Sequence, residues 1–93
     1  MKIADGFILR AVNGANGEVK NVVITAGPAT EKLNGMITLN NSCAFIWKIL
    51  EKGATREEVL NAMAKEYSVE VSEIESDVDA VINGFKQLGA IDE

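Results

Sequence analysis

Residues 35–50, GMITLNNSCAFIWKIL, constrain the fold more than any other stretch of the chain. A short apolar segment runs through Asn40, Asn41 and Ser42 directly into a run with large apolar side chains on every side of a helix. Between residues 43 and 50 only Lys48 is charged, so this helix must be covered on more than one side. We therefore predict a strand that turns sharply into a buried central helix, with any of Asn40, Asn41 or Ser42 as its N-cap.

The preceding residues predict a small antiparallel sheet. Residues 7–12 indicate a first strand, residues 19–25 include the β-branched run 22–24, and the turn residues at 13–17 between them favour a hairpin. Gly27 and Pro28 end the second strand, and residues 29–34 form a polar connection to a third strand at 35–39. In that strand Thr38 should point to the opposite face from Ile37 and Leu39. At least one edge of such a sheet must stay exposed.

Two further helices follow the central one. Gly53 is a typical helix stop, and Thr55 with Glu58 forms a capping box that opens an amphipathic second helix. Its apolar residues, Met63 and Tyr67 among them, recur at helical spacing and should pack on the first helix. After a linker at 68–71, Ser72–Glu75 predicts a second capping box and a third helix that runs to Gly89. The tail should dock through Ile91 alone. The predicted fold class is therefore α+β: a winged helix-turn-helix-like domain, with a three-stranded antiparallel sheet followed by a three-helix bundle, over residues 1–93 as a single domain.

Charge and composition exclude several function classes. Residues 42–93 carry five Lys or Arg against eleven Asp or Glu, a net charge of −6, so the winged-helix shape lacks the cationic surface that duplex DNA requires. No apolar run approaches the roughly 20 residues needed to span a bilayer, and no signal peptide is evident, so we expect a cytoplasmic protein. The single cysteine, Cys43, falls where the helix should be buried and is expected to be a core side chain.

An enzyme is not expected. The chain has no histidine, which excludes a His-based triad and a His-containing zinc site. The carboxylate pairs Glu57 with Glu58 and Glu75 with Asp79 lie on predicted exposed helical faces, where capping and solubility explain them. Neither a phosphate-binding glycine loop nor a carrier-protein serine motif is present. We predict no catalytic residues, no metal and no cofactor.

The sequence from Gly35 onward resembles the PqqD family, small proteins of pyrroloquinoline quinone (PQQ) and other peptide natural product biosynthesis. The resemblance rests on an ordered set: the strand ending in Leu39-Asn40, the helix with Ile46-Trp47, the Gly53 stop, Asp77-Val78 and Leu88-Gly89-Ala90-Ile91. It implies a non-catalytic recognition element that binds the leader of a ribosomally made precursor peptide and presents it to a modifying enzyme, a radical S-adenosylmethionine (SAM) protein in the quinone pathway. Residues 31–35 and 90–91 depart from the pattern of the quinone pathway members, which leaves the pathway open.

The resemblance also implies the binding site. The backbone of the third strand would bond the peptide as an added strand, and the third helix would form the opposite wall of a groove. The implied site residues are Met36, Ile37, Thr38 and Leu39 on the strand and Ile74, Asp77, Val78 and Val81 on the helix. For each apolar residue a plain core role is the competing interpretation, and a first-turn carboxylate such as Asp77 also stabilises its own helix. A winged-helix transcriptional regulator or another protein-interaction module is the alternative function, and the exposed edge could instead pair with a second copy as a homodimer.

Overall fold

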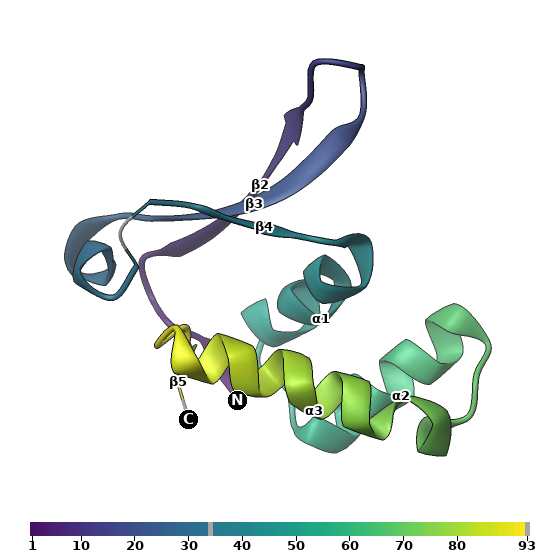
Figure 1. Ribbon diagram of the computed structural model, residues 1–93. Helices are drawn as coiled ribbons and strands as arrows, with labels where there is room; N and C mark the ends of the chain where they lie inside the picture. The colour runs from purple at the N-terminus through teal and green to yellow at the C-terminus, as the bar shows by residue number, and fades with distance from the viewer. Residues whose placement is uncertain (34, 93) are drawn as a thin grey trace.

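The computed structural model describes residues 1–33 and 35–92, and it confirms the predicted α+β architecture (Figure 1). A three-stranded antiparallel sheet of order β2-β3-β4 lies on one side of three helices. Its strands are β2 (Phe7–Asn13), β3 (Val19–Thr25) and β4 (Ile37–Leu39). The register pairs Phe7 with Thr25 and Val23 with Ile37, so β3 is central and β4 is an edge.

The helices are α1 (Asn41–Glu51), α2 (Arg56–Tyr67) and α3 (Val71–Gln87). Asn40 is the N-cap of α1, because its side-chain oxygen accepts a hydrogen bond from the Cys43 N–H at 2.8 Å. The capping box of Thr55 and Glu58 at the start of α2 is confirmed, with bonds of 3.1 and 3.0 Å. Gly53 follows α1 with a φ of 83°, a left-handed conformation that glycine adopts without strain.

The predicted second capping box is wrong. Ser72 lies inside the first turn of α3, and Glu70 is the N-cap residue. The Glu73 side chain accepts a hydrogen bond from the Glu70 N–H at 3.2 Å, so this carboxylate takes the role that Glu75 was predicted to have. The helix starts earlier because α2 ends in a single left-handed residue, Ser68, with a φ of 55°. The chain then needs only two more residues before it becomes helical again.

Two features lie outside the prediction. A 3₁₀ helix, η1 (Gly27–Glu31), follows β3 and covers the first half of the predicted polar connection at 29–34, with Pro28 in its first turn. The terminal strands β1 (Lys2–Ile3) and β5 (Ile91–Asp92) pair antiparallel as a second sheet. The tail is therefore held by more than Ile91, since Ala90 is also fully buried. Strands of two residues carry no periodic pattern from which they could be predicted.

The core is centred on α1, as predicted. Trp47 is completely buried, its ring edge-on to Phe85 at a centroid distance of 5.1 Å and tilted against Phe7 at 6.4 Å. These contacts tie α1 to α3 on one side and to β2 on the other. None of the helices in residues 1–33 and 35–92 is long and apolar enough to cross a lipid bilayer.

Candidate peptide-binding site

The free edge of β4 is the first component of the site. The backbone bonds from Gly14 N–H to Glu18 and from Ala26 N–H to Gly6, at 2.6 and 2.8 Å, show which pairs of the β2–β3 ladder exchange hydrogen bonds. Bonded and non-bonded pairs alternate in an antiparallel ladder, so the even-numbered residues of β3 face β2. Its odd-numbered residues, Asn21 and Val23, therefore bond to β4.

This alternation decides which groups of β4 are available. Asn21 pairs with Leu39 and Val23 with Ile37, so the N–H and C=O of those two β4 residues point toward β3. Thr38, which lies between them, directs its N–H and C=O to the open side. All four residues 36–39 were expected to bond the peptide through their backbone. Within β4, Thr38 alone has both its N–H and its C=O on the side where a strand could be added.

The side chains of this segment alternate as predicted. Leu39 is 8% exposed and packs in the core, Ile37 is half-buried, and Thr38 is exposed on the other face. Met36, just before β4, is 67% exposed, which makes it the most exposed of the large apolar side chains described. Met36 thus adds apolar surface next to the open edge of β4.

A pocket between the three helices is the second component. Its volume is about 210 Å³, and it is lined from α1, α2, α3 and the connection between the last two by Ser42, Ile46, Met63, Tyr67, Val69, Ile74, Asp77, Val78 and Val81. Ser42 lies two residues after the N-cap Asn40, so the pocket begins where β4 passes into α1. The end of β4 therefore lies near the pocket, although no β4 residue lines it.

All four residues predicted on the helical wall line this pocket. Val78 is 1% exposed, Ile74 and Val81 are half-buried, and Asp77 is exposed at the mouth. The structure thus brings the α3 residues together on one surface, although it also gives Val78 the core role that was its competing interpretation. Whether these side chains contact a peptide remains a prediction.

The contribution of α2 to the pocket was not expected. Met63 and Tyr67 follow one another at helical spacing, and the pattern indicated only that they pack on α1. Tyr67 is 45% exposed and stands edge-on to Phe45 of α1 at 6.1 Å. One feature of the sequence could have indicated this contribution, namely that Tyr67 lies in the last turn of an amphipathic helix. A tyrosine suits a partly exposed pocket wall because it combines an apolar ring with a polar tip. The pocket is thus apolar with hydroxyl and carboxylate groups at its mouth.

A second hollow among the described residues lacks these features. This wider and more open hollow of about 660 Å³ runs along α1 and α2, with Lys48, Lys52, Glu51 and Glu58 among its lining residues. It touches neither β4 nor α3. Among the residues that the structure describes, no cluster of three or more Cys, Asp or Glu side chains could hold a metal ion.

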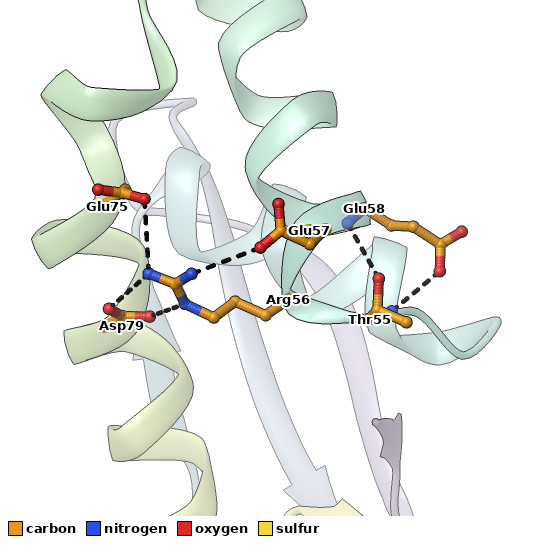
Figure 2. Close-up of polar contacts among 6 residues, drawn as sticks. All are labelled: Thr55, Arg56, Glu57, Glu58, Glu75 and Asp79. Atoms are coloured by element: carbon orange, nitrogen blue, oxygen red, sulfur yellow. Dashed lines mark hydrogen bonds and ion pairs between the residues drawn. The ribbon is translucent and has the colours of Figure 1, made fainter.

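An ion-pair cluster fixes α3 against α2 (Figure 2). Arg56, the first residue of α2, donates two hydrogen bonds to the Asp79 carboxylate at 2.7 and 3.0 Å. Its guanidinium also lies 3.8 Å from Glu75 and 3.7 Å from Glu57. The hydrogen bond from Arg56 lowers the pKa of Asp79 below its ordinary value. Glu75 and Asp79, which resemble a catalytic carboxylate pair in the sequence, therefore have a structural role in holding the helical wall.

Cys43 departs from the prediction in part. It is half-buried and packs against the core, so it is not fully enclosed. Burial raises the pKa of its thiol, which disfavours the reactive thiolate.

The start of α1 is tied to the sheet by a hydrogen bond of 3.1 Å from the Asn21 side-chain amide to the Asn41 side-chain oxygen.

Comparison with known proteins agrees with this fold. A solved structure titled "TbiB1 in Complex with the TbiA(beta) Leader Peptide" has a similar fold, with a TM-score of 0.73 and 22% identity over 97% of this chain and 93% of that one. No curated protein matches the sequence. The sequence profile of the family described as Coenzyme PQQ synthesis protein D (PqqD) matches residues 25–91, which is most of the chain and includes β4 and all three helices. The chain therefore belongs to the PqqD family.

Proposed function

We propose that this protein binds the leader segment of a ribosomally made precursor peptide by adding it as a strand to β4. The observation that carries the proposal is an edge strand, open at Thr38, that leads directly into the helix whose first turn lines the pocket of α1, α2 and α3. Main-chain bonds to an edge strand supply affinity for any extended peptide, and a neighbouring pocket selects side chains. Both components are present here, on elements that the family profile covers.

The structural neighbour supports this assignment. TbiB1 is seen with a leader peptide, and its fold matches over nearly the whole of both chains. At 22% identity the likeness shows the fold and not the ligand, so the leader peptide enters as part of the proposal. The β4 edge and the helical pocket are the features of this chain that such a ligand would use.

The pocket also predicts the kind of side chain that the leader presents. Its walls are mainly aliphatic, with room for one large apolar side chain that would be desolvated on binding. Asp77 at the mouth favours a basic residue next to that anchor, since complementary charges at a rim raise the encounter rate and the specificity.

We infer that the protein is an accessory rather than an enzyme. The carboxylates that could have formed a catalytic pair are engaged by Arg56, and the pocket residues carry no nucleophile next to a base. The bound peptide would be delivered to a separate modifying enzyme, which is a radical SAM protein if the pathway is that of PQQ. Such a handover would take place in the cytoplasm, where ribosomal precursors are made.

A backbone-amide titration tests the proposal. The ¹⁵N-labelled protein is mixed with synthetic peptides that cover the leader segments of short reading frames beside its gene, and amide shifts are followed by nuclear magnetic resonance. We expect shifts concentrated in residues 36–40 and in the pocket residues of α3. Shifts confined to the 13–17 turn, or none with any leader, would refute strand addition at β4.

The β4 edge could also be occupied by a second copy of the chain. Sedimentation velocity with and without a leader peptide separates the two uses of the edge. If a dimer forms through β4, the peptide should dissociate it, because both compete for the backbone of Thr38. A dimer that binds the peptide without dissociating would place the self-contact elsewhere.

A further inference from the structure

The outer face of the three-stranded sheet is unusual because it is apolar. Side chains of an antiparallel sheet alternate between its faces, and paired residues share a face. Phe7, Val23 and Leu39 point toward the helices and lie in the core. The opposite side, here called the outer sheet face, consists of Ile8, Arg10, Val12, Lys20, Val22, Ile24 and Thr38.

Four of these seven side chains are β-branched and aliphatic. Val22 is 6% exposed, yet it is not part of the core that the helices share, and the half-buried Ile8 and Ile24 are absent from that core too. Val12 is 42% exposed. The solvent face of an antiparallel sheet is normally polar, and among the described residues no helix covers this one. Val22 is itself almost covered, so the apolar side chains that this face can offer to a partner are Ile8, Val12 and Ile24.

Charge indicates what kind of partner would fit. Both charged residues of the outer sheet face are cations, Arg10 and Lys20, and Glu18 lies 4.0 Å from Lys20 at its margin. Residues 1–41 carry four cations and three carboxylates, whereas residues 42–93 carry five cations and eleven carboxylates. An apolar centre beside arginine is typical of protein interfaces. Two copies packed face to face would set these cations against themselves, which disfavours self-association through this face.

The outer sheet face also lies next to the proposed peptide site. Thr38 belongs to both, since its side chain is on the outer face and its backbone is on the open edge. The tip of the β2–β3 hairpin projects away from the helices (Figure 1), and Arg10, Val12 and Lys20 of the outer sheet face are exposed. A protein seated there would be beside a strand added to β4.

From these observations we infer that the outer sheet face docks the peptide-modifying enzyme, through an apolar patch of that enzyme rimmed by carboxylates. This inference rests on the proposed function, because a bound leader is what would give the docked enzyme its substrate. The helical pocket would then hold the peptide while the opposite side of the same sheet holds the enzyme.

The test compares Arg10→Glu and Val12→Glu with Lys65→Glu. Arg10 and Val12 are exposed on the outer sheet face, while Lys65 is an exposed cation on α2 that changes net charge as Arg10 does. Binding to the purified peptide-modifying enzyme encoded beside the gene is measured by biolayer interferometry. Leader affinity is measured separately by fluorescence anisotropy. We expect each outer-face variant to weaken enzyme binding at least about tenfold, with leader affinity and thermal stability unchanged, and Lys65→Glu to bind the enzyme normally.

The outcomes separate the two proposals. Unchanged enzyme binding by both outer-face variants, with normal leader affinity, overturns the docking inference and leaves the proposed function standing. A wild-type protein that binds leader but not enzyme has the same consequence. If the wild type binds neither, the proposed function fails and the docking inference fails with it. Loss of a dimer in Arg10→Glu by sedimentation velocity would make a second copy the occupant, which also overturns the inference.

Discussion

Replacing Thr38 by proline gives the sharpest test of the strand-addition geometry. Proline has no N–H, and its fixed φ is tolerated on an edge strand when the lost donor faces solvent. The alternation in the β2–β3–β4 sheet places the Thr38 N–H on the open side, so Thr38→Pro should leave the β3–β4 ladder intact. The same change at Ile37 removes a donor that bonds to Val23.

The expected magnitude follows from one unmade hydrogen bond. With Thr38→Pro the leader carbonyl that would accept from this residue is buried without a partner, which costs about 1–3 kcal/mol. Taking about 2 kcal/mol, and 1.4 kcal/mol for each tenfold change, the leader should bind roughly thirtyfold more weakly. The free protein loses no internal bond, so its free energy of unfolding should change by less than about 1 kcal/mol.

The assay pairs leader affinity with stability for both variants. Fluorescence anisotropy with a labelled leader gives the dissociation constant, and urea denaturation gives the free energy of unfolding. Thr38→Pro should lose affinity and keep stability, whereas Ile37→Pro should be destabilised by about 1–3 kcal/mol through the orphaned Val23 carbonyl. Normal leader affinity in a folded Thr38→Pro variant would refute the reasoning. A reversed stability order would show that the alternation is assigned to the wrong residues.

Three further changes test the pocket, a turn and the ion-pair cluster. Ile74→Ala should weaken leader binding by about 1 kcal/mol, roughly fivefold, because it removes a half-buried side chain from the pocket wall. Val71→Ala is the control: it lies on the same helix but outside the pocket, and it should leave the affinity in the anisotropy assay unchanged. Ser68→Gly should raise the free energy of unfolding by about 0.5–1 kcal/mol, since Ser68 has a φ of 55°, while Ser72→Gly inside α3 should lower it in the same urea titration. Arg56→Met should melt below the wild type at pH 7. The pKa of Asp79 is lower in the folded protein than in the unfolded chain, so its ion pair with Arg56 stabilises the fold above the unfolded pKa of about 4. This stabilisation is lost as the carboxylate protonates at lower pH, and the difference in melting temperature should shrink there. Lys65→Met controls for the loss of a cation.

The central elements could be predicted from the sequence because their signals are local. The apolar run at 43–50 fixed α1 as the centre of the core, and the Thr55 capping box fixed the start of α2. The hairpin followed from its turn residues, and the β3 bounds agree with those predicted. In each of these cases residues a few positions apart satisfy one another, so the information lies within a single segment.

The parts that escaped prediction depend on contacts between distant segments. The pairing of Ile3 with Ile91 joins the two ends of the chain, and nothing in either dipeptide indicates a strand. The α3 residues of the pocket came from a family resemblance, but Met63 and Tyr67 of α2 were assigned to helix packing alone. A stripe of apolar residues shows which face of a helix is turned inward. It does not show where two such faces fail to meet and leave a pocket.

Both walls of the proposed site are held in place before any peptide binds. On the strand side Leu39 is buried in the core, and the Asn21–Asn41 hydrogen bond ties the start of α1 to β3. On the helical side Arg56 holds α3 through Asp79, on a turn of the helix that includes Val78 of the pocket. A site fixed in this way loses little conformational entropy on binding, so most of the ordering cost falls on the peptide. Differences in affinity between leaders should then depend on how readily each becomes extended and on the side chain it offers to the pocket, rather than on rearrangement of the protein.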